Sequence, residues 1–189
     1  MRARLVVACL AGVLAGCRAP SRAAGPPLPF DEEGACPFVC CTYRDWTVDW
    51  DTDVYADRTP GAAVSTHVSL GQTVRALTGV VSTTKVGRAV ADRPIVVGTK
   101  HLPVAAGAPI YLIRNVGGGD WKIWVDGQVD QQYIPSQGYC TGDRQSADEC
   151  AIRVVEQPDN VWWVHLRDAW GTEGWTREVD HFGNIDSCG

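Results

Sequence analysis

From residue 36 onward the chain consists of short β-favouring runs separated by turn residues, and this pattern constrains the fold more than any other feature. Val, Thr, Ile, Trp and Tyr cluster in the runs, and Gly, Pro, Asn and Asp lie between them. Within 161–167 and 121–125, one set of alternate positions is apolar throughout, as expected when one face of a strand is buried. The expected buried set is Trp162, Val164, Leu166, Trp121, Ile123 and Val125.

No segment shows the helix-period apolar spacing together with convincing caps, so we predict an all-β fold. Residues 146–157 are the one candidate for a single helical turn. Turn-like segments at 117–119, 126–127 and 168–174 separate several of the predicted strands. The predicted strands are 46–48, 52–55, 73–77, 88–91, 110–114, 121–125, 161–167 and 174–177.

The N-terminus carries two arginines, an apolar run over 5–15 and the string Leu14-Ala15-Gly16-Cys17. Eleven residues are too few to span a bilayer as a helix. The pattern resembles a bacterial lipoprotein signal peptide with its lipobox. That resemblance implies that residues 1–16 are removed and that Cys17 is lipidated. It places the protein in the cell envelope, and Arg18 after the cysteine favours the periplasmic face of an outer membrane if the host has two membranes.

Residues 18–35 are rich in Pro, Ala, Gly and charge and show no periodicity. Such a composition is typical of a disordered or polyproline-like linker. We therefore expect residues 17–35 to be a lipidated cysteine followed by a flexible tether.

Eight cysteines become six when Cys9 in the signal peptide and Cys17 are set aside. In an exported chain an even number favours three disulfides, with fifteen possible connectivities. Cys140 and Cys150 bracket a polar loop, and adjacent Cys40 and Cys41 are poor partners for each other. The favoured pairs are Cys140–Cys150, Cys36–Cys41 and Cys40–Cys188.

The segment 162–178, WWVHLRDAWGTEGWTRE, resembles the end of bacterial SH3-like (SH3b) domains, and 54–77 resembles the start of one. The distance between them implies two tandem units or one unit with a large insertion, since a single such domain commonly has about 60 residues. A weak repeat relates 68–77 to 104–113. We expect two degenerate, packed SH3-like barrels, residues 36–103 and 104–189.

Eight tryptophans are available for the core or for ligands. Trp162 and Trp175 are predicted to be core residues. Strand alternation instead turns Trp124 and Trp163 outward, where a tryptophan serves an interface or stacks against a peptide or glycan. His165 and Arg167 lie beside Trp163 on the same face, so these four form the candidate ligand-binding set: Trp124, Trp163, His165 and Arg167.

Several classes of function lack support in the sequence. Net charge is −5 and basic residues are scattered, which argues against nucleic acid as a partner. The 36–41 cysteines lack a second ligand pair, the four histidines are dispersed, and the alternating acids at 49–53 lack a calcium-loop glycine and glutamate. We predict no metal, no cofactor and no catalytic residue, since no known catalytic motif is present.

Two functional hypotheses follow. The favoured one is a non-enzymatic, lipid-anchored envelope protein whose SH3-like module binds cell-wall peptide or glycan, or an envelope protein. The alternative is a small periplasmic enzyme with a site assembled around His165, Arg167 and Asp168 near the C-terminal tryptophans.

Overall fold

The computed structural model describes residues 24–140 and 148–188. Strands make up most of this part, whose helices are three short 3-10 turns, so the all-β prediction is confirmed. The 3-10 helices are η1 (Gln137–Cys140), η2 (Asp148–Ala151) and η3 (Val179–His181). The strands are β1 (Phe30–Glu33), β2 (Asp45–Val48), β3 (Thr52–Tyr55), β4 (Val64–Val68), β5 (Thr73–Lys85), β6 (Gly87–Ala91), β7 (Ile95–Val97), β8 (Leu102–Val104), β9 (Pro109–Gly117), β10 (Asp120–Val125), β11 (Gln128–Tyr133), β12 (Ile152–Glu156), β13 (Asp159–Arg167), β14 (Glu173–Thr176) and β15 (Phe182–Gly183).

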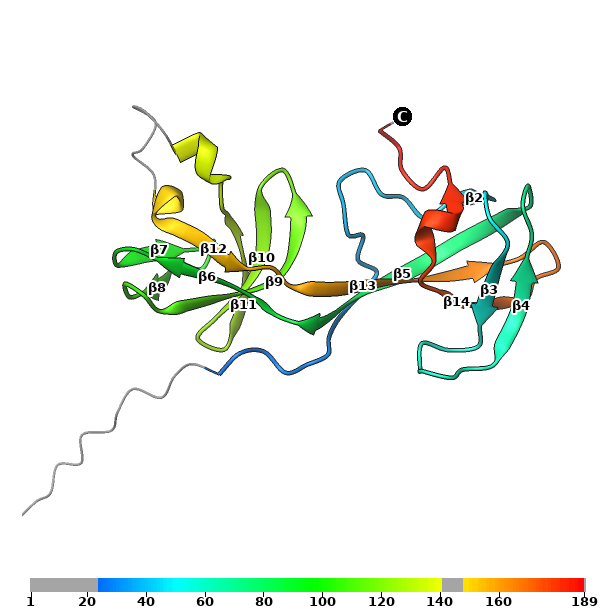
Figure 1. The fold of residues 1–189 in the computed structure, drawn as a ribbon, viewed down its shortest axis with the longest axis horizontal. Helices are drawn as coiled ribbons and strands as arrows, with labels where there is room; N and C mark the ends of the chain where they lie inside the picture. The colour runs from blue at the N-terminus through cyan, green and yellow to red at the C-terminus, as the bar shows by residue number, and fades with distance from the viewer. Residues whose placement is uncertain (1–23, 141–147, 189) are drawn as a thin grey trace, which may run out of the picture.

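The strands form two main sheets that lie beside each other (Figure 1). The first sheet has the order β15-β2-β5-β13-β14-β3-β4, with β1 also paired to β5. The second has the order β11-β10-β9-β6-β12, and β7 and β8 form a separate hairpin. We call the first sheet and its core the first unit, and the second sheet with the hairpin the second unit.

The two units divide the chain differently from the expected boundary between residues 103 and 104, which falls inside β8. The first unit takes strands from both 30–85 and 159–183, and the second unit comprises 87–156. The reason is the long antiparallel ladder between β5 and β13, which joins two segments far apart in the sequence. The second unit is therefore inserted into the first.

A two-stranded ribbon connects the units, because β5 leads into β6 and β12 leads into β13. The pair Lys85↔Asp159 closes one ladder and Arg88↔Glu156 opens the next. Lys85 Nζ lies 2.7 Å from Glu156 Oε1 at this junction. Gly87 is needed there, since a Cβ would lie 2.6 Å from the Glu156 carbonyl oxygen and 2.7 Å from Pro158.

Each unit has its own apolar core, and the predicted strand alternation is confirmed at both tested segments. The first core is built around Trp46, Val48, Val54, Val74, Trp162, Val164, Leu166 and Phe182. The second is built around Ala89, Ile110, Leu112, Trp121, Ile123, Val125 and Ile152. All six side chains expected to point inward are buried.

Strand β1 lies within the segment expected to be a flexible tether, so that expectation is wrong for residues 30–33. β1 pairs with residues 80–83 of β5. The Glu32 side chain is 9% exposed, accepts from Arg114 Nε of β9 at 2.7 Å and pairs with Lys122 of β10, both in the second unit. Composition alone suggested a flexible linker, but ion pairs with Arg114 and Lys122 of the second unit hold this segment in place.

Three disulfides staple the fold, and they are the three favoured from the sequence: Cys36–Cys41, Cys40–Cys188 and Cys140–Cys150. The second ties the C-terminal end to the loop that precedes β2. Cys17 and the predicted signal peptide lie outside the described residues. The predicted helical turn corresponds to η2, and β12 follows it directly.

Candidate binding site

The structure separates the four predicted ligand-binding residues into two groups. Trp163, His165 and Arg167 share the outward face of β13 in the first unit. Trp124 lies on β10 of the second unit, where its indole Nε1 donates to the Ala24 carbonyl at 3.0 Å. Trp124 is therefore a partner of the N-terminal segment and does not join the other three.

Trp175 stands on the same outer face, although it was predicted to be a core residue. On β14 the inward positions belong to Gly174 and Thr176, both buried, so alternation turns Trp175 outward. Its ring stacks on that of His165, with centroids 4.7 Å apart and planes 17° from parallel. The two residues are direct partners in the β13–β14 ladder.

Two arginines lie over these aromatic faces. The Arg58 guanidinium is 5.2 Å from the centroid of Trp175, and Arg177 is 5.9 Å from Trp163. Both distances suit a cation–π contact. Sequence reasoning missed these arginines, because only the strand register brings the β3–β4 loop and the end of β14 beside β13.

Trp163 borders a cleft of about 430 Å³ between β13 and the β3–β4 loop. The cleft is lined by Tyr55, Arg58, Thr59, Pro60, Gly61, Ala62, Trp163, Arg177 and Glu178. We call it the Trp163 cleft. It combines one broad indole face with two guanidinium groups and a carboxylate.

The loop that forms one wall of the Trp163 cleft is held by its own polar contacts. Thr59 donates to Asp57 Oδ1 from both its hydroxyl and its backbone N–H. These two hydrogen bonds hold the pKa of Asp57 below its usual range, and the bond from the Thr59 hydroxyl has the larger effect. Arg58 is anchored by Asp31 and Glu33 of β1, each at 3.2 Å.

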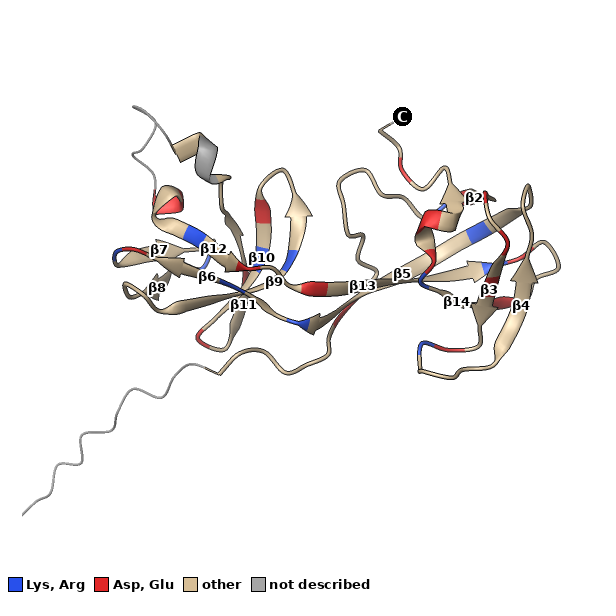
Figure 2. Ribbon diagram, viewed as in Figure 1, with Lys and Arg blue, Asp and Glu red and all other residues tan. Residues whose placement is uncertain are grey.

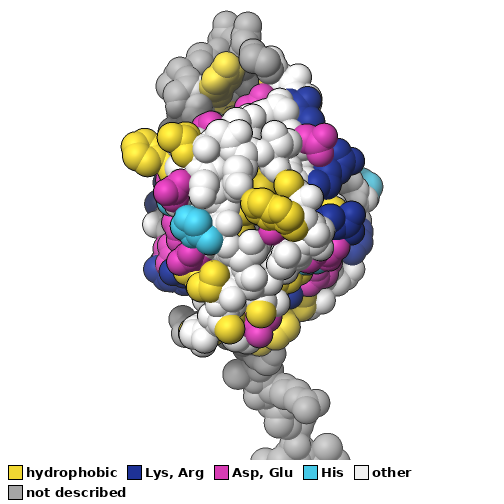
Figure 3. Space-filling model, turned by 90° about the vertical axis from the view of Figure 1, so that its right-hand side faces the viewer, with side chains coloured by type: hydrophobic (Ala, Val, Ile, Leu, Met, Phe, Trp, Pro, Cys, Tyr) yellow, Lys and Arg dark blue, Asp and Glu magenta, His cyan; other side chains and the backbone are white. Residues whose placement is uncertain are grey.

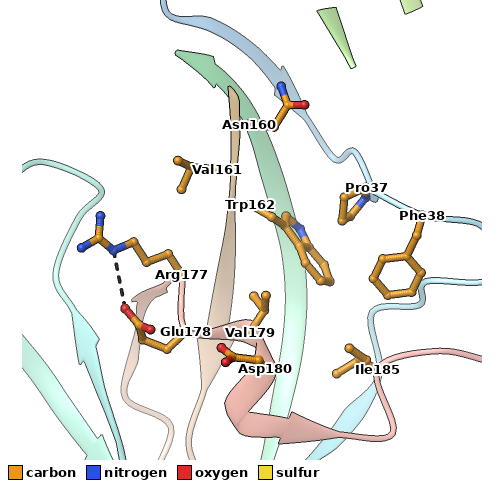
Figure 4. A pocket seen from close by; sticks show the side chains of 10 residues that line it. All are labelled: Pro37, Phe38, Asn160, Val161, Trp162, Arg177, Glu178, Val179, Asp180 and Ile185. Atoms are coloured by element: carbon orange, nitrogen blue, oxygen red, sulfur yellow. Dashed lines mark ion pairs between the residues drawn. The ribbon is translucent and has the colours of Figure 1, made fainter. Parts of the chain in front are cut away.

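A second hollow, of about 600 Å³, lies at the neighbouring edge of β13 and is shown in Figure 4. We call it the Trp162 hollow. Its lining residues are Pro37, Phe38, Asn160, Val161, Trp162, Arg177, Glu178, Val179, Asp180 and Ile185. Arg177 and Glu178 line both cavities and form an ion pair of 3.5 Å, so the two hollows meet at this pair.

Of the three residues of the alternative enzyme hypothesis, His165 and Arg167 meet at the Glu173 carboxylate, whereas Asp168 has other partners. Arg167 pairs with Glu173 at 2.6 Å, and His165 Nε2 lies 3.5 Å from the other oxygen of that carboxylate. Asp168 is buried and accepts hydrogen bonds from the Thr66 hydroxyl and the backbone of the β13–β14 turn. Through these hydrogen bonds Asp168 stabilises the β13–β14 turn.

One group among the described residues has the donor types and spacing for a cation: Glu178, Asp180 and His181, whose ligand atoms lie within 4.8 Å of one another. Both carboxylates are exposed, and Glu178 already faces Arg177. The alternating acids of the β2–β3 region do not gather, since Asp51 accepts from the Leu70 N–H and Asp53 pairs with His67.

The remaining surface is mixed in character. Lys and Arg are interspersed with Asp and Glu along both units (Figure 2). The exposed Trp50, Leu70 and Trp170 lie on three loops of the first sheet, and apolar side chains on the end shown in Figure 3 form separate spots between polar ones. The two cavities at β13 are therefore the strongest candidate site.

The chain matches no protein-family model, no curated protein and no solved structure. In the described ranges, 24–140 and 148–188, no helix has the length and apolar character needed to cross a bilayer.

Proposed function

We propose that this protein is a lipid-anchored, non-enzymatic component of the cell envelope whose SH3-like β module binds cell-wall material or an envelope protein. The observation that carries the proposal is the Trp163 cleft, in which a partly exposed indole lies next to two arginines. A purely structural tryptophan on this strand faces inward, as Trp162 does. Trp163 instead borders open space.

The chemistry of the cleft suits a ligand with a flat or apolar face beside polar groups. An indole face stacks against a sugar ring or a peptide plane. A guanidinium donates in pairs to a carboxylate, such as those of wall peptides. Glu178, which also lines the cleft, can accept from hydroxyl or amide donors. Wall peptide and glycan both supply these groups.

The anchor is the second part of the proposal. Acylation of Cys17 would hold the chain at a membrane, on the periplasmic face of the outer membrane in a host with two membranes. In cells, Cys17→Ser should move the protein from the membrane fraction to the soluble fraction. Unchanged membrane retention of this variant would contradict the anchor.

Binding is tested by sedimentation with purified peptidoglycan. Wild type should cosediment, and Trp163→Ala should lose most of that retention. Trp170→Ala is the matched control, because Trp170 is 74% exposed and lies on a loop of the same unit. Equal retention of wild type and Trp163→Ala would refute wall binding through this cleft.

A further inference from the structure

Strand β13 has an open edge where the two cavities meet. On one side it pairs with β5 along its whole length, from Asp159 to Arg167. On the other side β14 pairs only with residues 164–167, and the chain then leaves the ladder to form η3, which contacts β13 without pairing with it. In the described structure, residues 160–163 therefore have a strand neighbour on one side only.

The ladder determines which backbone groups face this open side. The Trp163 carbonyl oxygen points toward β5, since it lies 2.9 Å from where a Cβ of Gly79 would stand. In an antiparallel ladder the N–H and C=O of one residue point to the same side, and successive residues alternate. The N–H and C=O of Trp162 consequently face the open edge.

Side-chain alternation places one cavity on each face beside this edge. The Trp162 side chain contributes to the Trp162 hollow, together with Phe38, whose ring meets it edge-on at 5.7 Å. The Trp163 side chain contributes to the Trp163 cleft on the opposite face. A strand laid along the open edge would thus place successive side chains in the two cavities in turn.

We propose that the occupant of this edge is an extended peptide that adds to β13 as an antiparallel strand. This inference rests on the proposed binding function and narrows its ligand to a peptide, because only a polypeptide backbone supplies both a donor and an acceptor to Trp162 at the spacing of a ladder. The peptide residue opposite Trp162 exchanges two hydrogen bonds with it. Its side chain enters the Trp162 hollow.

The lining of the Trp162 hollow defines the side chains of the peptide. Phe38, Val179 and Ile185 provide an apolar wall, which selects an apolar residue opposite Trp162. Glu178 and Asp180 stand at the rim with Arg177 as their one cationic neighbour among the lining residues, so the rim carries a net negative charge (Figure 4). A basic residue two positions from the apolar one stays on this face and complements that charge.

Hydrogen exchange tests the edge directly. In the free protein, the Trp162 amide should exchange much faster than the Trp163 amide, although both lie within one strand and the Trp162 side chain is buried. The probe is the synthetic peptide Lys-Thr-Val-Thr-Lys, acetylated and amidated at its ends. At saturation it should slow exchange of the Trp162 amide at least about tenfold, as expected when a new hydrogen bond forms.

Binding measurements with a fluorescein-labelled version then separate backbone from side-chain contributions. N-methylation of the central valine should weaken binding at least about tenfold, because it removes the donor to the Trp162 carbonyl. Exchanging both lysines of the peptide for glutamates should also weaken binding. Asp180→Asn should reduce the difference in affinity between the lysine peptide and the glutamate peptide. The Phe38→Ala variant should bind the parent peptide more weakly than wild type, whereas the Trp170→Ala variant should bind it as tightly as wild type.

Three results would overturn the strand-addition proposal. They are a dissociation constant weaker than about 1 mM for the parent peptide, equal binding of its N-methylated form, and no change in Trp162 amide exchange at saturation. Each is distinguishable from failure of the proposed function. If peptidoglycan retention depends on Trp163 but the peptide does not bind, wall binding stands and strand addition fails. If the peptide binds at Trp162 and peptidoglycan does not, the partner is an envelope protein.

Discussion

Trp162 and Trp163 are neighbours in β13, yet they border two different cavities on opposite faces of the first sheet. Trp162 is 7% exposed, belongs to the first core and donates to the Tyr43 hydroxyl at 3.2 Å. Trp163 lies on the outer face under Arg177. The Trp162 side chain therefore stabilises the first core, whereas the Trp163 side chain is available to contact a ligand.

This division predicts opposite outcomes for the two alanine substitutions. Trp162→Ala should lower the free energy of unfolding by about 3–5 kcal/mol, because it leaves a large cavity in the first core. Trp163→Ala should cost less than about 1.5 kcal/mol while removing the binding surface. Urea unfolding followed by circular dichroism measures both. Equal destabilisation would contradict the assignment of Trp163 to the open face.

The Glu32 ion pairs should matter far more for stability than the exposed acids of the same strand. Glu32→Gln leaves the Arg114 cation, 10% exposed, without its carboxylate, and we expect a loss of about 3–5 kcal/mol. Asp31→Asn breaks an ion pair at a side chain that is 36% exposed, and should cost under about 1 kcal/mol. The comparison uses the same unfolding assay. A loss for Asp31→Asn as large as that for Glu32→Gln would show that β1 is not held by its buried charge.

Two disulfides that close loops of very different length should differ in their contribution to stability. Cys40 and Cys188 are 148 residues apart, whereas Cys140 and Cys150 are separated by 10. The chain-entropy model gives about 5 kcal/mol for the first loop and about 3 kcal/mol for the second. Replacing each pair by two serines and measuring urea unfolding should reproduce this order. A larger effect from the short loop would contradict it.

Stability should fall in acid partly through Asp168 and Asp130. Burial by itself would raise the pKa of each, but hydrogen bonds outweigh it and lower both pKa values: the Thr66 hydroxyl and turn amides act at Asp168, and neighbouring amides with the Thr99 hydroxyl act at Asp130. A folded-state pKa below the unfolded value near 3.9 contributes stability that is complete above that value. The contribution is lost as the pH falls through the lower folded-state pKa.

The Asp168→Asn variant isolates this effect. It should be less stable than wild type at neutral pH, and the difference should shrink when the pH falls below about 4. Urea midpoints at a series of pH values provide the measurement. A difference between variant and wild type that does not change with pH would mean that ionised Asp168 does not stabilise its turn.

Local pattern was sufficient for several features of the fold. The two-residue period of a strand, applied to 161–167, predicted that Trp162, Val164 and Leu166 are buried, because this period is a property of the strand itself. Turn residues bounded β3 correctly from Thr52 to Tyr55. Geometry argued against a Cys40–Cys41 bond and the polar loop favoured Cys140–Cys150, and the set of pairs favoured from the sequence is the one observed.

Features that depend on distant partners could not be predicted in this way. β5 pairs with β13, so the second unit is inserted between two parts of the first. Neither the residues of β5 nor those of β13 specify by themselves that these two strands pair, or in which register. Trp175 was predicted to be a core residue, yet it stacks on His165, and this position depends on the register in which β14 pairs with β13. The segment of β1 was predicted to be a linker, because the partners that neutralise Glu32, residues 114 and 122, are far away in the sequence. In the site, Trp163 was predicted from the sequence, whereas Arg58 and Arg177, which line the same cleft, were not.

The most direct test of binding at β13 follows the eight tryptophan indole N–H signals of nitrogen-15-labelled protein. Solubilised peptidoglycan fragments are titrated in, with each signal assigned by single substitution. We predict that the Trp163 signal shifts with the added fragments, while those of Trp50 and Trp170 stay in place. Shifts confined to Trp50 or Trp170, or no shift at any indole, would contradict the Trp163 cleft as the binding site for wall material.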